Sequence, residues 1–414
     1  MGFQAPARRA AYFLFAAGFA MRLAMLWFGG IAPLGVVEPA NLALSLVESG
    51  SYADAYGVGS GPSAHTMPGH PLLIAGLVRV FGREVGMGAA LAVTASAAAA
   101  LAYALLPLMS AGAGLGWRVG AFAGLAGELL PVNFWPQTRG VFDAPFTLLA
   151  LTALVTALAR PWSKGYLTGW RAAGVGLMAA AGILFSAHVV AVVGSWLVAA
   201  WLLFRGDFRS WARGLAIIGG LMGVVLLVWA ARNERALGKW VMTRSNFGLE
   251  LHVSNNDAAS ADGEANLRNP AWGRLHPSIN GTQLAALRRL GEVEYHARKR
   301  QEAMTWIREH PMTFVRLTAE RAVLFWFPVM RRPWQTAVQA LLMVLALVGV
   351  RLLWRRNRAF GWLLAASCVS YSLVYLVVQV TPRYRLPIEG LLLLVAAMGV
   401  QRLVQLLGSR VKAV

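Results

Sequence analysis

The chain has 414 residues, of which 57% are hydrophobic and only 14% are charged, whereas soluble globular domains carry about 25% charged residues. This composition excludes an ordinary soluble protein and indicates an all-α polytopic membrane protein. The formal net charge is +20, but the basic residues gather in short clusters between apolar runs and form no patch with stacking aromatics, which argues against nucleic acid as a partner.

Apolar runs of about 18 to 22 residues predict spanning helices along most of the chain. The first run, near 10–30, is too long for the apolar part of a signal peptide and lacks a convincing cleavage site, so we interpret it as an uncleaved span. About ten spans are predicted in all, near 10–30, 87–107, 116–132, 143–159, 172–187, 189–204, 214–231, 335–354, 360–379 and 386–407. Segment 68–82 is predicted as a re-entrant or interfacial helix.

The charge distribution predicts the orientation. Five basic clusters fall on one side of these spans, which the positive-inside rule makes cytoplasmic. They are Arg8/Arg9, Arg160/Lys164/Arg171, Arg205/Arg209/Arg213, Arg351/Arg355/Arg356/Arg358 and Arg410/Lys412. Both termini are therefore expected inside, and we expect a bacterial plasma (inner) membrane protein.

The predicted organisation has three parts. Residues 1–231 form a transmembrane module with a first external loop at 31–86, residues 232–334 form an extracytoplasmic helical domain against the membrane, and residues 335–414 form the last spans. In the external domain Thr282 is the expected helix N-cap, and Pro311 ends one helix and starts the next. This domain is expected to roof a cavity.

Three acidic residues stand out near or inside the spans. Glu38 follows the first span, where a carboxylate is costly unless it is solvated or partnered, so it is either a functional group or an interfacial residue in water. Asp143 precedes Ala144 and Pro145, where it could cap a helix or point into a polar cavity. Glu128 lies inside an apolar run and requires a partner or a cavity, and Arg118 is too far along the helix to serve.

Weaker signals lie in the rest of the first external loop. Asp54 is a second acidic candidate there, and a turn role is its competing interpretation. His65 and His70 are five residues apart without a nearby carboxylate, which is a poor pattern for metal ligands.

Arginines at the external span ends suggest an anionic ligand. They are Arg139, Arg331, Arg332, Arg383 and Arg385. The planar guanidinium matches phosphate oxygens, and a lipid phosphate lies at that depth. Snorkelling to ordinary headgroups explains Arg331 and Arg332. Arg383 and Arg385 lie in the proline-bounded segment "PRYR" on the outside, against the charge rule, and we interpret them as a phosphate clamp.

Several stretches together resemble C-type (GT-C fold) glycosyltransferases. An early glutamate followed by "GPSAHTMPGHPLLIAGLVRVFG" is similar to the first external loop of the protein O-mannosyltransferase-like, or family 39-like, branch. "RSNFGLELHVSNN" and "PRYRLPIEGLLLLVAA" resemble the later external domain and last span of bacterial members. The chain departs from the pattern at His70, where an aromatic residue is usual, and at Gly69, where a second proline is usual.

The resemblance implies an inverting enzyme that takes a sugar from a polyprenyl-phosphate donor on the external face. It implies Glu38 as general base, Asp143 as a second acidic group, and Arg383 and Arg385 near the donor phosphate. Arg139, at an external span end, is also expected to bind phosphate. Other residues expected to bind substrate are Asp54, His65, His70, Asn246, Glu250, Asn255 and Tyr384. The acceptor is expected to be a glycan, a lipid or a protein. No cofactor is expected, although Mg²⁺ or Mn²⁺ could share the work of the arginines.

Two alternatives stay open. A transporter or flippase of lipid-linked saccharides predicts broken helices, internal symmetry and a polar track across the bilayer, and the sequence contains no inverted repeat. A polysaccharide (O-antigen-type) ligase also joins many spans to a large external loop with arginines, but would lack the early acidic loop.

Overall fold

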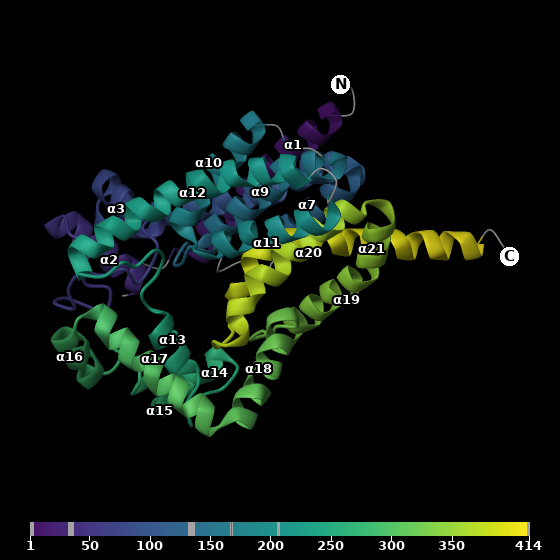
Figure 1. The fold of residues 1–414 in the computed structure, drawn as a ribbon. Coiled ribbons are helices and arrows are strands. Elements are labelled where there is room, and N and C mark those ends of the chain that lie inside the picture. Colours follow the sequence, from purple (N-terminus) through teal and green to yellow (C-terminus); the bar gives the residue numbers. More distant parts are fainter. Residues whose placement is uncertain are drawn as a thin grey trace.

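The computed structural model describes residues 4–31, 37–130, 137–165, 167, 169–204 and 208–411. These residues are mostly helical, and within them the β-structure is limited to two isolated bridges, Ala53–Pro62 and Asp262–Val380. Figure 1 shows a long bundle of helices from both ends of the chain, with α13–α17 gathered on one side and both termini at the far end from them. The all-α prediction is confirmed.

The helices of the bundle come from two stretches of chain. The first stretch contains α1 (Gln4–Gly29), α2 (Glu38–Ser49), α3 (Gly69–Phe81), α4 (Arg83–Val85), a π-helical turn (Gly86–Ala90), α5 (Leu91–Ala104), α6 (Leu106–Gly112), α7 (Trp117–Leu129), α9 (Ala144–Lys164), α10 (Gly169–Phe185), α11 (His188–Leu203) and α12 (Phe208–Leu237). The second contains α19 (Pro333–Arg356), α20 (Arg358–Ser372), the 3₁₀ helices η3 (Leu373–Leu376) and η4 (Pro382–Ile388), and α21 (Glu389–Val411).

Seven helices among the described residues are long and apolar enough to cross a membrane. They match seven of the predicted spans, at Ala5–Gly29, Arg83–Gly112, Ala144–Lys164, Trp211–Leu237, Pro333–Arg356, Arg358–Leu376 and Pro382–Leu406. Predicted spans 172–187 and 189–204 correspond to the shorter apolar helices α10 and α11, and 116–132 to the 13-residue α7. A count of ten is therefore not established, because these three helices are shorter than the roughly 20 residues that cross a bilayer.

Glycines let the membrane helices approach closely. A Cβ atom at Gly349 of α19 would collide with the backbone of Val395, and one at Gly399 of α21 would collide with the backbone of Leu345. The same crowding holds for Gly120 of α7 against Leu106. Small residues at helix interfaces are the usual route to tight packing in a bilayer, where the hydrophobic effect does not drive helices together.

The acidic residue inside α7 has the partner that it requires. Glu128 is 4% exposed and forms an ion pair with Arg22 of α1, which is 1% exposed. Arg22 also donates through Nη2 to Gln137 Oε1 (2.9 Å), and Gln137 donates to the Tyr103 hydroxyl (2.9 Å). A buried pair of this kind depends on further hydrogen bonds to its polar atoms. Here Nη1 and Nη2 of Arg22 make such bonds, whereas Arg22 Nε and Glu128 Oε1 have no partner among the described residues.

The external domain contains six helices. They are α13 (Phe247–Ser254), α14 (Gly263–Arg268), α15 (Pro270–Gly273), α16 (Gly281–Leu290), α17 (Glu292–Glu309) and α18 (Pro311–Trp326). Pro311 begins α18 as predicted, but the N-cap of α16 is Asn280 and not Thr282. Asn280 Oδ1 accepts from the backbone N–H groups of Thr282 (2.9 Å) and Gln283 (3.1 Å), because a side chain at the N-cap itself can reach these orphan donors.

A hydrogen-bonded seam joins the first external loop to the external domain. We define the seam as residues 52–66 together with Arg232, Ser245, Glu292 and His296. The Tyr56 hydroxyl lies 2.7 Å from His65 Nδ1 and 3.0 Å from His296 Nε2. The Glu292 carboxylate accepts from the Ala64 N–H (2.7 Å), and Arg232 donates to the Ser63 carbonyl (2.6 Å).

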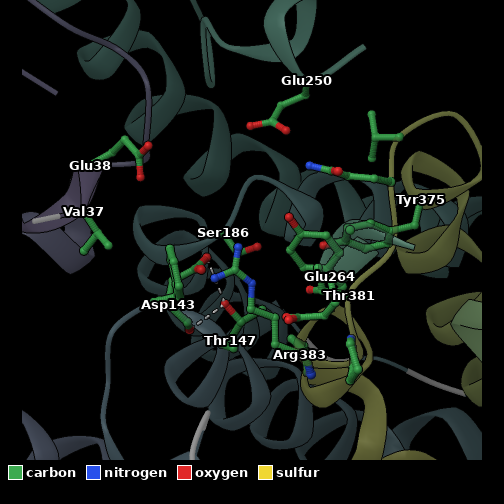
Figure 2. A pocket seen from close by; sticks show the side chains of 18 of the residues that line it. Val37, Glu38, Asp143, Thr147, Ser186, Glu250, Glu264, Tyr375, Thr381 and Arg383 are labelled. Atoms are coloured by element: carbon green, nitrogen blue, oxygen red, sulfur yellow. Dashed lines mark hydrogen bonds between the residues drawn. The ribbon is translucent and has the colours of Figure 1, made fainter. Parts of the chain in front are cut away.

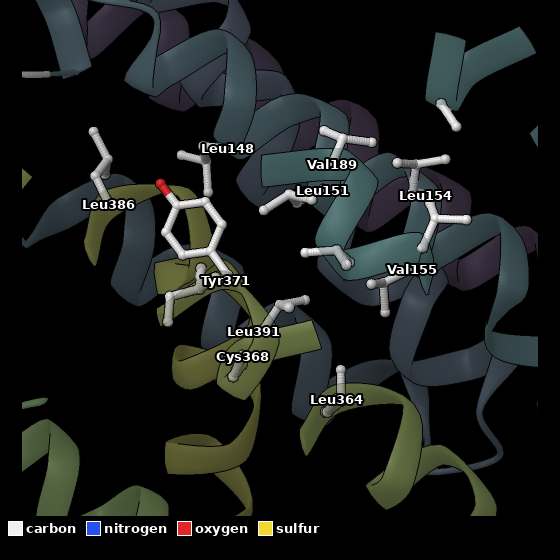
Figure 3. Close-up of a cluster of buried hydrophobic side chains, with 14 of the residues drawn as sticks. Leu148, Leu151, Leu154, Val155, Val189, Leu364, Cys368, Tyr371, Leu386 and Leu391 are labelled. Carbon is white, nitrogen blue, oxygen red and sulfur yellow. The ribbon is translucent and has the colours of Figure 1, made fainter. Parts of the chain in front are cut away.

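The apolar core beneath the seam is centred on α9. Leu148, Leu151, Leu154 and Val155 are fully buried on this helix, and they meet side chains of α11, α20, η4 and α21 in one cluster (Figure 3). Packing around α9 therefore places the 3₁₀ helix η4 and the first residues of α9 next to each other.

Candidate active site

A cavity of about 1970 Å³ lies between one end of the helix bundle and residues 232–334, the domain that is predicted to be external. Its lining comes from α1, α2, α3, α9, α11, α13–α15, the connections around 243, 276 and 331, and the segment from Tyr371 to Pro387. Five carboxylates, five arginines and four histidines lie in this lining. The cavity thus collects charge at the point where the bundle meets the external domain.

Glu38 faces this cavity from the first turn of α2. The N-cap of this helix is the extended Val37, so Glu38 itself is the first helical residue. Its Oε1 accepts a hydrogen bond from the Ser278 hydroxyl at 3.0 Å, and the side chain is half-buried. The carboxylate is therefore held at the cavity wall by the external domain.

Asp143 occupies the N-cap position of α9, yet its side chain makes no cap hydrogen bond. The Thr147 hydroxyl donates to the Asp143 backbone carbonyl at 3.1 Å and reaches carboxylate Oδ2 only at 3.5 Å. The carboxylate faces the cavity with Glu38 and Glu250 (Figure 2). Of its two predicted roles, the structure favours the one in the cavity.

Arg383 projects into the same cavity from η4. Its guanidinium carbon lies 3.5 Å from the centroid of the Phe142 ring and 5.2 Å from that of Tyr384, which are distances typical of cation–π contacts. Figure 2 shows the guanidinium pointing toward Asp143, and both Glu38 and Asp143 attract it electrostatically. In the described part of the chain no ion pair occupies Arg383, so a cation is available for an anionic ligand.

The other two arginines assigned to phosphate do not line the cavity. Arg385 is 2% exposed and donates to the Trp326 carbonyl at 3.0 Å. The predicted turn is a 3₁₀ helix, in which the side chains of residues two apart point in directions about 120° from each other, so Arg383 and Arg385 diverge. Arg139 is partly buried outside the lining. The two-arginine clamp is therefore not what the structure contains.

Five of the seven predicted substrate-binding residues line the cavity: His65, His70, Asn246, Glu250 and Tyr384. Asn246 donates to Glu250 at 3.2 Å, and Tyr384 stacks on Tyr375 with ring centroids 4.7 Å apart. His70 Nε2 pairs with the Gly140 carbonyl at 2.9 Å, whereas its buried Nδ1 has no partner within the part of the chain that the structure describes.

Asp54 and Asn255 lie elsewhere. Asp54 has a φ of 67° and accepts from the Gly61 N–H at 2.9 Å, which is the turn role. Asn255 is fully buried, where it donates to the Val377 carbonyl at 2.9 Å and accepts from Arg321 at 3.1 Å. Both therefore hold backbone and side chains in place and cannot reach a ligand in this cavity.

Burial keeps the seam histidines neutral. It lowers the pKa of His65 well below its usual value and that of His296 to about 3. Because one hydroxyl bridges both rings, Tyr56 donates to one nitrogen and accepts from the other, which requires that one ring nitrogen carry a proton and the other not. His65 and His296 therefore contribute hydrogen bonds and not positive charge.

The sequence analysis did not identify four residues that line the cavity. They are Tyr375 and His188, whose rings stack, and the polar residues Arg244 and Ser278. Tyr375 stacks on His188 at 5.3 Å as well as on Tyr384. Arg244 donates to the His65 carbonyl at 2.9 Å and also lines the cavity. The pair of tyrosines in "YSLVY", one helical turn apart and just before Arg383, was a usable signal. Nothing local marks His188, Arg244 or Ser278.

A metal site is not evident in the geometry. Among the described residues, no group of three or more His, Cys, Asp or Glu side chains is arranged to hold a metal ion.

Comparison with known proteins adds a fold likeness. No family model matches the chain, and no curated protein matches it either. Among solved structures, the chain is similar to the archaeal oligosaccharyltransferase AglB from Archaeoglobus fulgidus, in complex with an inhibitory peptide and a dolichol-phosphate. The TM-score is 0.57 at 12% sequence identity, and the match covers 100% of this chain and 52% of AglB. The chain thus has the fold of about half of that protein.

Proposed function

We propose that this chain is an inverting glycosyltransferase that moves a sugar from a polyprenyl-phosphate donor to an acceptor hydroxyl at the extracytoplasmic face of the membrane. The observation that carries the proposal is that Glu38, Asp143 and Arg383 converge on one cavity from three distant segments. A base, a second carboxylate and a cation are the groups that such a transfer requires.

In the proposed reaction Glu38 takes the proton of the acceptor hydroxyl. The acceptor oxygen forms a bond to the anomeric carbon on the face opposite the phosphate, and the bond from that carbon to the phosphate oxygen breaks. The electron pair leaves with the polyprenyl phosphate. Arg383 stabilises this growing charge more in the transition state than in the ground state, and Asp143 stabilises the positive anomeric centre and orients Arg383.

Cavity size and the fold likeness support two substrates in one site. The volume of about 1970 Å³ exceeds the 300–1,000 Å³, roughly, of a typical small-molecule pocket. The AglB structure holds a dolichol-phosphate, which is a lipid phosphate, and an inhibitory peptide. By analogy we assign a lipid-linked donor here, with a glycan, lipid or protein as acceptor. The distribution of the basic clusters supports cytoplasmic termini.

The test combines a variant with mass spectrometry of cellular glycolipids and polysaccharides. Deleting the protein should remove one sugar modification, wild type should restore it, and Glu38→Gln should not, although it folds and inserts normally. Polyprenyl-phosphate sugar should accumulate in the variant because transfer stops. Full restoration by Glu38→Gln, or glycoforms that do not change on deletion, would contradict the proposal. Loss of activity on chelation would add Mg²⁺ or Mn²⁺ to it.

A further inference from the structure

We infer that Ser278 is a positioning residue, whose hydroxyl orients the Glu38 carboxylate and favours its ionised form. The inference rests on the proposed function, since it takes Glu38 as the base. Ser278 Oγ donates to Glu38 Oε1 at 3.0 Å across the cavity wall, although the two residues are 240 positions apart. The external domain would thereby complete a site whose base belongs to the first external loop.

The segment that carries Ser278 is well anchored. Trp272 is 4% exposed, and its Nε1 donates to the Val253 carbonyl of α13 at 2.7 Å. The His276 ring stacks on Trp272 at 5.8 Å, and Asn280 caps α16 just beyond. Ser278 therefore sits between two fixed points, and its hydroxyl is placed by the fold of the external domain.

The backbone of Ser278 is engaged separately from its side chain. Its N–H donates to His276 Nδ1 at 3.2 Å, so the hydroxyl is left to donate to Glu38. This separation means that Ser278→Ala removes only the bond to the carboxylate and leaves the bond to His276 intact.

Glu38 needs this donor because of its neighbours. Asp143 and Glu250 share the cavity (Figure 2), and like charges disfavour ionisation. The positive charge of Arg383 favours the ionised form of a nearby carboxylate. Tyr56 is neutral and feels the charge of Glu38, which raises the pKa of its hydroxyl, and His276 also lines the cavity. A hydrogen bond to the charged form favours it, so Ser278 should hold the base deprotonated to lower pH than Glu38 would reach alone.

The experiment follows protonation without any substrate. Carbodiimide with glycine ethyl ester labels protonated carboxyl groups, and mass spectrometry of the Glu38 peptide from detergent-solubilised protein gives the labelled fraction against pH. In Ser278→Ala the midpoint should rise by roughly half a pH unit to one unit. Ser278→Thr should restore the wild-type midpoint, and Ser278→Cys, a weak donor, should lie between. Glu264, which also lines the cavity, is the internal control whose midpoint should not move.

The outcomes separate the two ideas. A Glu38 midpoint that is the same in wild type and Ser278→Ala overturns the inference, whether or not the enzyme is active. A shift shared equally by Glu264 also overturns it, because the effect would then be general. Glycosyl transfer that survives in Glu38→Gln overturns the assignment of the base, and with it the proposed function, independently of the labelling result.

Discussion

The seam and the cavity contain the same types of polar residue, but these residues have more hydrogen-bond partners in the seam than in the cavity. In the seam, the Glu292 carboxylate accepts two hydrogen bonds, from the Ala64 N–H and the Ser245 hydroxyl, and His65 and His296 share one hydroxyl. In the cavity, Glu38 accepts only one, from Ser278, and Arg383 has no ion-pair partner among the described residues. Buried and paired polar groups stabilise a fold, whereas unpaired ones facing a hollow are available to a ligand.

The largest contrast is expected between the two arginines of η4. Arg383→Ala should lower kcat/KM for sugar transfer by about 100- to 1000-fold, because it removes a cation at the leaving phosphate. It should lower the melting temperature less than Arg385→Ala, because it loses only the contacts with the Phe142 and Tyr384 rings. Arg385→Ala should instead lower the melting temperature, because the Trp326 carbonyl loses its donor. The measurement is transfer kinetics beside a melting curve for each variant. Equal kinetic losses in two equally stable variants would break the contrast.

This contrast also marks how far the sequence could lead. Glu38, Asp143 and Arg383 were predictable because a charge at the edge of an apolar run has few structural reasons to be there. The divergence of Arg385 was not, since it depends on the backbone being a 3₁₀ helix. Helix positions followed from hydropathy, including the short α10 and α11, whereas the end of α7 at Leu129 did not.

Some residues of the site carry no local sequence signal, so the sequence could not predict their place in it. Ser278 and His188 meet the site only through tertiary packing of segments that are far apart in the chain. Asp54 and Asn255 have polar side chains like those of binding residues, and only their hydrogen bonds reveal a structural role.

A smaller effect is expected on stability, where replacing Glu292 of the seam should reduce the free energy of unfolding more than replacing Glu38 of the cavity. Glu292→Ala leaves the buried Ala64 N–H and the Ser245 hydroxyl without their acceptor, which should reduce the free energy of unfolding by about 1–3 kcal/mol per unsatisfied group. Glu38→Gln, at the half-buried cavity wall, should change stability by less than about 0.5 kcal/mol. Denaturant or thermal unfolding in detergent gives both values. A Glu292→Ala protein as stable as wild type would mean that the hydrogen bonds of the seam do not hold the first external loop in place.

The smallest effect is a pH dependence of the seam. Burial lowers the pKa of His296 to about 3, and the pKa of His65 falls for the same reason. A histidine in the unfolded chain has a pKa of about 6.5. Below that value the unfolded chain binds more protons than the folded one, so stability should fall as the pH drops from about 6.5 toward 3, with a slope of at most about 1.4 kcal/mol per pH unit for each histidine. Melting curves between pH 7 and 5 measure it.

His296→Gln removes one titrating group and should flatten the slope, while His310→Gln, at the exposed end of α17, is the matched control that should not. If the slope of His296→Gln equals that of wild type, the seam histidines are not the groups that respond to acid.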